Sequence, residues 1–323
     1  MIAVAPTVRS IGGLVIHGYG TESVGHPVVV LLHGIGGSAE SCAPVARLLA
    51  ESGLAVWCVD AAGYGDSADP GPDHDVVGDA LRVLDAVSPD RPAVLFGTSW
   101  GGVVAMSAAL RRPDRVAALV LADSTRGSGT DGAKATAMRA RIAELAEHGG
   151  EFVAAARAPR LTGPNADPDV VAAVHASMHA LRLSGFAAAA EFMASTDLGP
   201  HLGEIACPTL VLVGEHDIVT GVEESRLLAE HIAGARRDVT VGARHQVTTD
   251  TQHHAIAGTQ HEVTTDARRQ LTTDARRQLT TDTGRQVTAD ARHHVIADAG
   301  HVAIQEQPQL VAELVVRFVG ELS

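Results

Sequence analysis

Cysteines and long apolar runs are both scarce in this chain of 323 residues, and each scarcity excludes a class of protein. Cysteine occurs only at Cys42, Cys58 and Cys207, which is too few for a disulfide framework and suits a reducing compartment. No stretch approaches the ~18 consecutive apolar residues of a transmembrane helix, so none is expected. Hydrophobic residues still make up 46% of the chain, enough for a sizeable core, which excludes global disorder.

Basic residues are outnumbered, since 25 Lys and Arg residues stand against 38 Asp and Glu residues, a net charge of −13. Nucleic acids and anionic membranes need a basic face, so neither is an expected partner. Residues 1–6 lack the basic flank and the long apolar run of a signal peptide. We therefore expect a soluble cytoplasmic protein.

A tandem repeat with a period of eight residues occupies the C-terminal third of the chain. Seven octads fill residues 243–298, from ARHQVTTD to ARHHVIAD, and residues 235–242 (ARRDVTVG) fit the same frame. Each octad combines a short β-leaning stretch with a turn-prone end, and most hold too few large apolar residues to bury a face. We predict a solvated or loosely β-structured insertion, with stacked short strands as the alternative. Deletion of residues 243–298 is expected to leave a foldable protein.

Elsewhere, strand-like and helix-like segments alternate. Continuous apolar runs predict buried parallel strands at residues 28–32, 54–59, 93–96, 116–121 and 209–213. Helix-length stretches lie at residues 40–51, 75–87, 101–111, 222–233 and 309–322. This alternation predicts a parallel sheet covered by helices on both faces. Residues 130–197 are rich in alanine and contain helical patterns without a strand, so they are predicted to form a helical cap.

A G-x-S-x-G motif follows the predicted strand that ends at Phe96 and opens the next predicted helix. In that position the motif is typical of a nucleophile elbow, a strained turn that exposes the hydroxyl of Ser99. Gly97 and Gly101 must be small because neighbouring backbone packs tightly around such a turn. Ser99 is therefore the candidate nucleophile.

The loop after the first predicted strand contains the sequence HGIGG at residues 33–37. Such a loop can supply one backbone N–H to a developing oxyanion, and the residue after the nucleophile supplies the second. We predict an oxyanion hole formed by the amides of Ile35 and Trp100. His33, Gly34 and Trp100 are expected beside the substrate, with the His33 ring fixing the loop through hydrogen bonds rather than acting as a base.

These motifs resemble those of α/β-hydrolases, and the resemblance covers essentially the whole chain outside the octads. Residues 60–67 (DAAGYGDS) resemble the D-x-x-G-x-G-x-S turn of that superfamily. Within it, the chain is similar to 3-oxoadipate enol-lactonases and carboxylesterases in residues 31–36, 185–198 and 207–217. The resemblance implies an α/β-hydrolase fold, a mostly parallel sheet flanked by helices, with a helical cap and here an octapeptide-repeat insertion. The expected division is core 1–124, cap 125–200, core 201–242, insertion 243–298 and C-terminal core 299–323.

The order of the catalytic groups in this superfamily is serine, acid and histidine. Asp217 follows the last predicted strand and is the implied acid, with Glu215 and Asp123 as the alternatives. The implied base is His301, in a G-H-x-x-x-x-E-x-P ending whose Pro308 suits the first turn of the closing helix. The third position of each octad is equivalent to His301 in sequence, and is occupied by His245, His253, His261, Arg269, Arg277, Arg285 and His293.

The resemblance implies a serine hydrolase that cleaves a small-molecule ester or lactone through an acyl-enzyme, without a metal or an organic cofactor. The alternatives are a C–C bond hydrolase acting on a dicarbonyl compound with the same triad, and a non-catalytic binding protein that kept the fold. The octad histidines raise the possibility of metal binding, but their spacing matches no zinc pattern, so no metal site is predicted. Met178 and Phe192 of the cap are candidates either for the acyl site or for the core.

Overall fold

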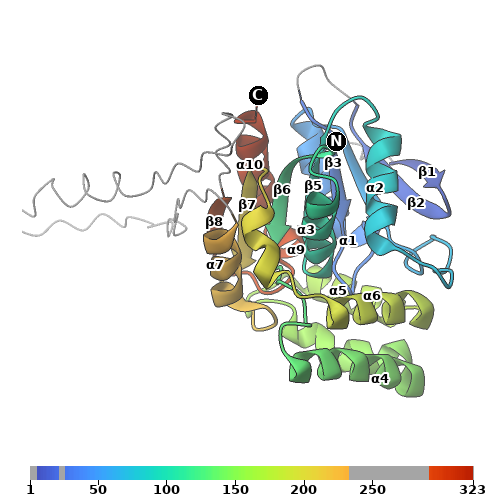
Figure 1. Ribbon diagram of the computed structural model, residues 1–323. Coiled ribbons are helices and arrows are strands. Elements are labelled where there is room, and N and C mark those ends of the chain that lie inside the picture. Colours follow the sequence, from blue (N-terminus) through green and yellow to red (C-terminus); the bar gives the residue numbers. More distant parts are fainter. Residues whose placement is uncertain (1–5, 22–25, 233–290, 323) are drawn as a thin grey trace, which may run out of the picture.

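One mostly parallel sheet organises residues 6–21, 26–232 and 291–322, the part of the chain that the computed structural model describes (Figure 1). From edge to edge its strands are β1 (Thr7–Ile11), β2 (Leu14–Tyr19), β4 (Val56–Asp60), β3 (Val29–Leu32), β5 (Ala93–Thr98), β6 (Val116–Ala122), β7 (Thr209–Gly214) and β8 (Ala291–Ile296). The pairs β1–β2 and β2–β4 are antiparallel, and every other pair of neighbours is parallel. The predicted parallel sheet is therefore present.

The central strands form where the sequence has its continuous apolar runs. Every residue of β3, β5 and β7 is buried, as expected of strands covered on both faces. The N-terminal hairpin of β1 and β2 was not predicted. Its strands mix polar and apolar residues and β1 is largely exposed, so no apolar run marks it, while Gly12 and Gly13 form its turn at positive φ.

Helices cover both faces of this sheet. Helices α1 (Ala39–Glu51), α9 (Ala303–Glu306) and α10 (Pro308–Gly320) share one hydrophobic core with one face. Helices α2 (Val76–Val87), α3 (Trp100–Arg111) and α7 (Gly221–His231) pack on the opposite face. No helix in the described part of the chain combines the length and the apolar character needed to cross a bilayer.

The cap is the helical segment between β6 and β7, and its main helices gather at one end of the sheet (Figure 1). It contains α4 (Gly132–Arg157), the 3₁₀ turn η1 (Ala158–Arg160), α5 (Pro168–His179), α6 (Leu183–Ser195) and the 3₁₀ turn η2 (Gly199–Glu204). Helix α4 is broken into two legs at Gly149, whose φ of 76° and ψ of 174° are not helical. The sequence analysis predicted helical patterns in residues 130–197 but did not locate this break.

The last octad belongs to the sheet, although the sequence analysis assigned it to the insertion. Its residues 291–296 form the edge strand β8, which pairs with β7 in parallel register. His293, His294 and Ile296 are buried, and Nε2 of His293 lies 2.8 Å from the hydroxyl oxygen of Ser225. This burial fixes the octad in the core. The other six octads, with their predicted insertion and metal-binding alternative, lie outside the described residues.

The structure therefore moves the boundary of the expected deletion. Removing residues 243–290 keeps β8 intact, whereas removing residues 243–298 makes residues 235–242 the replacement strand. That replacement puts Arg237, Asp238 and Thr240 where His293, His294 and Ile296 are buried. Because burying an unpaired charge is strongly unfavourable, we expect the longer deletion to unfold at a clearly lower temperature. Thermal unfolding followed by circular dichroism measures the difference, and equal midpoints would contradict the assignment.

Candidate active site

Ser99 lies at the sharp turn between β5 and α3. Its φ of 50° and ψ of −116° are strained for a residue with a side chain, as the predicted elbow requires. The turn is held by the Ser99 N–H, which donates to the Ala122 carbonyl at 2.9 Å, and by the Ser124 hydroxyl, which donates to the Ser99 carbonyl at 2.8 Å. A Cβ on Gly97 would overlap the carbonyl of Gly101, which explains why the turn needs glycine there.

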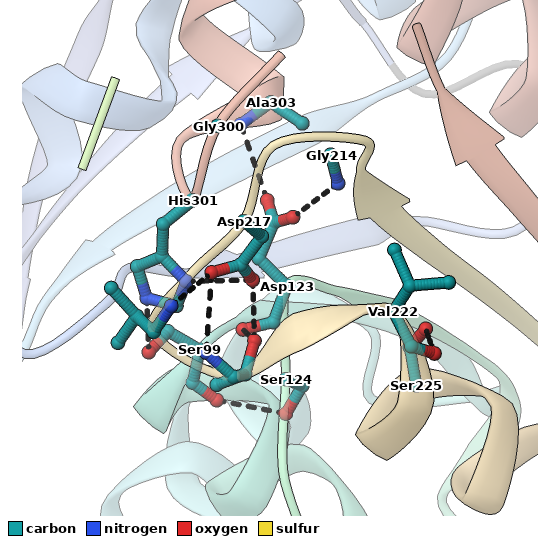
Figure 2. Close-up of polar contacts among 12 residues, drawn as sticks. Ser99, Asp123, Ser124, Gly214, Asp217, Val222, Ser225, Gly300, His301 and Ala303 are labelled. Carbon is teal, nitrogen blue, oxygen red and sulfur yellow. Dashed lines mark hydrogen bonds and ion pairs between the residues drawn. The ribbon is translucent and has the colours of Figure 1, made fainter. Parts of the chain in front are cut away.

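His301 joins the serine to a carboxylate (Figure 2). It lies in the loop between β8 and α9, where its Nε2 is 3.0 Å from Oγ of Ser99 and its Nδ1 is 3.0 Å from Oδ2 of Asp217. Nδ1–H donates to the carboxylate, which leaves Nε2 free to accept the serine hydroxyl proton. The structure thus brings together the three side chains predicted as nucleophile, base and acid.

Asp217 lies in the turn after β7, where hydrogen bonds hold its carboxylate in place and favour its ionised form. Its Oδ1 accepts from the Val219 N–H at 2.7 Å, and its Oδ2 accepts from the Thr220 hydroxyl at 2.5 Å. Burial raises the pKa of Asp217, but the hydrogen bond and charge of His301, together with these donors, lower it to about 2. The carboxylate is therefore ionised at neutral pH.

His301 is buried, and its pKa reflects opposing causes. Burial lowers the pKa, but the hydrogen bond that the ring donates to Asp217 and the charges of Asp217 and Asp123 raise it above its ordinary value. The positive charge of Arg141 on the cap acts in the opposite direction to these carboxylates. The imidazole therefore lies in a field that stabilises the protonated ring.

The two alternative acids occupy other places. Asp123 is buried at the end of β6, where it accepts the N–H groups of Gly214 at 2.8 Å and Ala303 at 3.2 Å. Burial raises the pKa of Asp123 to about 7. Its hydrogen bonds tie the end of β7 to the start of α9, which begins two residues after His301. Glu215 is exposed, and its carboxylate accepts the N–H of Asp298 at 3.3 Å.

The histidines equivalent to His301 in sequence separate in space. His293 is buried in β8 against Ser225, as described above, and not against Ser99. His245, His253 and His261 lie outside the described residues. Within the described chain, His301 is the imidazole bonded to Ser99.

Glu306 is the glutamate of the G-H-x-x-x-x-E-x-P ending, and the structure gives it a role that the sequence analysis did not. Its Oε1 accepts the N–H of Gly300 at 2.8 Å, directly before His301. Its Oε2 accepts the N–H of Gly163 at 2.7 Å, in the cap segment after η1. One carboxylate therefore holds the histidine loop to the cap. The motif signalled the residue, but the cap partner is more than a hundred positions away and has no sequence signal.

The loop at residues 33–37 borders a cavity of about 370 Å³ between the sheet and the cap, which we call the Ser99 cavity. Gly34, Ile35, Ser99 and Trp100 all line it, as does Met178 of the cap. The Tyr64 hydroxyl donates to the carbonyl of Ile35 at 3.1 Å and helps to hold the loop.

His33 does not line the Ser99 cavity, contrary to its expected place beside the substrate. Its Nδ1–H donates to the Gly34 carbonyl at 2.8 Å, and its Nε2 accepts the Ala61 N–H at 3.2 Å. The buried ring also packs against Tyr64 and Trp100, with centroid distances of 4.7 Å and 5.6 Å. Burial lowers the pKa of His33, which keeps the ring neutral in this role. Both nitrogens are occupied, so the ring fixes the loop.

Phe192 and a cluster of three exposed side chains lie outside the Ser99 cavity. Phe192 of the cap packs against the hydrophobic core instead of lining the cavity. Within the described chain, the exposed side chains of Glu215, His216 and Asp298 have ligand atoms within 4.8 Å of one another. These three residues are not among those that line the Ser99 cavity.

A capped, mostly parallel sheet with a serine at the β5–α3 elbow and a histidine and an aspartate at its rim defines an α/β-hydrolase. The family described as serine aminopeptidase, S33, matches residues 25–252, and the chain belongs to this family. This hydrolase assignment covers most of the chain.

Several relatives are named as ester or lactone hydrolases. The chain is 30% identical over 190 residues to 3-oxoadipate enol-lactonase 2 of Acinetobacter baylyi, covering 57% of this chain and 69% of the relative. It is 32% identical over 222 residues to pimeloyl-[acyl-carrier protein] methyl ester esterase of Chromobacterium violaceum, covering 66% and 85%. The fold matches a thermophilic esterase from Thermogutta terrifontis with a TM-score of 0.71 and 24% identity, over 99% of this chain and 98% of that one.

Proposed function

We propose that the protein is a serine hydrolase that cleaves a carboxylic ester or a lactone through an acyl-enzyme. The observation that carries the proposal is the chain of two 3.0 Å hydrogen bonds from Ser99 through His301 to Asp217. A serine hydroxyl is a weak nucleophile until a neighbouring base accepts its proton, and this arrangement supplies that base. The ester and lactone names of the relatives support the choice of bond.

In the acylation step, Oγ of Ser99 attacks the carbonyl carbon while Nε2 of His301 accepts the hydroxyl proton. The ionised Asp217 stabilises the resulting imidazolium and holds its tautomer. The carbonyl oxygen becomes an oxyanion, for which we assign the amides of Ile35 and Trp100 as donors. Each such donor is worth about 3 kcal/mol in the transition state.

The tetrahedral intermediate then collapses. The bond between the carbonyl carbon and the alcohol oxygen breaks, and the leaving oxygen takes the proton from His301. In a lactone the released hydroxyl remains on the acyl chain. Water then attacks the acyl-enzyme with His301 again as the base, and the carboxylic acid leaves Ser99 free.

A substrate panel tests this proposal. The purified full chain should turn over one or more members of a panel of short-chain p-nitrophenyl esters, methyl esters and lactones, followed by p-nitrophenolate absorbance or by titration of the released acid. An absence of turnover on the whole panel by folded protein would instead favour a non-catalytic binding protein. The serine variant that controls this assay is treated in the Discussion.

The pH dependence of kcat/KM follows from the charge around His301. Only the neutral ring can accept the serine proton, so activity should fall as the pH decreases through the pKa of His301, which lies above the usual value of about 6.5. Because the pKa of Asp123 is itself about 7, its carboxylate is charged only in the upper part of this limb. Asp123→Asn removes that charge, which should lower the pKa of His301 and move the upper part of the limb to lower pH. The exposed Asp114→Asn variant is the control. A limb that stays in place or moves upward in Asp123→Asn contradicts the argument.

A further inference from the structure

The cap side of the Ser99 cavity is cationic, although the chain as a whole is strongly acidic. Four basic residues of the cap line the cavity, and we call them the cap cations: Lys134, Arg141, Arg157 and Arg160. Glu224 is the one carboxylate in the described lining, and it is already bound by Arg126 with N–O distances of 2.8 Å and 3.0 Å. The cavity therefore carries an excess of positive charge that its own walls do not neutralise.

The break in α4 brings these cations together. Arg141 lies on the first leg of the helix, Arg157 lies at the end of the second leg, and Arg160 follows in η1. An ion pair between Arg157 and Glu144 joins the two legs. Arg157 is thus neutralised by the cap itself.

Among the cap cations, Arg141 alone is both half-buried and without an ion pair to any described residue. Arg157 is half-buried but paired, and Lys134 and Arg160 are exposed. Nη1 of Arg141 donates a hydrogen bond to the sulfur of Met138 at 3.9 Å, and a thioether is a weak acceptor. A guanidinium has five N–H donors, so most of its capacity remains unused. Burial lowers the pKa of Arg141, and the charges of Arg157 and Arg160 lower it further while Glu144 opposes them. A bound anion would relieve this repulsion.

The position of Arg141 is suited to a substrate group. Its positive charge acts on the pKa of His301, and its side chain lines the same cavity as Ser99. Apolar side chains of the cap, among them Met138, Met178 and Met193, line this cavity as well. Such a wall is suited to the apolar part of an acyl chain.

We propose that Arg141, with Arg160, which is unpaired among the described residues, also lining the cavity, binds a carboxylate carried by the substrate, so that the enzyme prefers ester or lactone substrates that are themselves carboxylic acids. The preference for such substrates rests on the proposed function. The anion site itself does not, because it is argued from the position of Arg141 alone. A carboxylate is the chosen anion because one half-buried guanidinium lacks a counter-charge, and a planar guanidinium binds a carboxylate with two parallel hydrogen bonds.

A matched pair of esters tests the proposal. Monomethyl adipate and methyl hexanoate have acyl chains of equal length, and only the first carries a free carboxylate. We expect the wild-type protein to prefer monomethyl adipate. The assays are run well above the pKa of His301, where the loss of the Arg141 charge does not change the protonation of the base. Arg141→Gln should then lower the kcat/KM for monomethyl adipate by about 10- to 100-fold while leaving methyl hexanoate within about twofold, and Arg141→Lys should retain part of the preference. Arg139→Gln is the control, because Arg139 pairs with Glu191 on the exposed face of the same helix.

Three results would overturn the proposal: no preference in the wild type, an equal loss on both esters in Arg141→Gln, or the same loss in Arg139→Gln. Calorimetric titration of adipate into the wild type and into Arg141→Gln separates this inference from the proposed function. If neither ester is hydrolysed but adipate binds and the binding is lost in Arg141→Gln, the ester hydrolase proposal fails and the anion site is supported. If adipate does not bind the wild type, the anion site is excluded.

Discussion

Ser99→Ala should lower kcat for ester hydrolysis by about 10⁶-fold, to the level left by binding and the oxyanion donors alone. The loss is this large because no other described hydroxyl lies on Nε2 of His301. Alanine keeps a Cβ at the strained turn, and the backbone hydrogen bonds of residue 99 to Ala122 and Ser124 do not use the hydroxyl. The variant should therefore fold with a thermal midpoint close to that of the wild type.

Ser107→Ala is the matched control for this experiment. Ser107 lies on α3, the helix that Ser99 opens, and its hydroxyl donates within the helix to the Val103 carbonyl at 2.8 Å. Its activity should equal that of the wild type. Retention of more than a tenth of the activity by Ser99→Ala would assign the hydrolysis to another residue or to a contaminating enzyme.

Asp217→Asn should lower kcat by about 10⁴-fold, the second largest effect that we expect. The asparagine side chain can donate a hydrogen bond to Nδ1 of His301, which favours the tautomer with the proton on Nε2. That tautomer cannot accept the proton of Ser99. Steady-state kinetics with the best substrate of the panel measure the effect.

Glu215→Gln serves as the control for the acid, since Glu215 is exposed and accepts only a backbone N–H in the described contacts. Its activity should remain near the wild-type value. If Asp123→Asn loses far more activity than Asp217→Asn, the acid is Asp123 and the assignment made from the geometry is wrong.

The sequence predicted most of the sheet and the three side chains at its rim for different reasons. The central strands are continuous apolar runs, and a short run such as residues 93–96 is typical of a strand that is covered on both faces. Ser99 and His301 are each marked by local motifs, because glycine must stand at fixed spacing around an elbow and before the histidine. Asp217 depended on family order, since carboxylates are common after strands.

What the sequence did not predict depends on partners that are distant along the chain. The β1–β2 hairpin has no apolar run, and the role of Glu306 requires the cap residue Gly163 as its partner. The end of the octad segment was misplaced because all copies share one pattern, and only burial against Ser225 selects the copy that forms β8. The cationic cap side arises from the bend at Gly149, which brings together arginines of two helix legs.

The two hydrogen bonds of Glu306 link the cap to the loop that carries the base. The same carboxylate binds the N–H groups of Gly163 in the cap and of Gly300 beside His301. A single side chain therefore joins the cap segment after η1 to the backbone that carries His301. Substitution of Glu306 by alanine would remove both contacts at once.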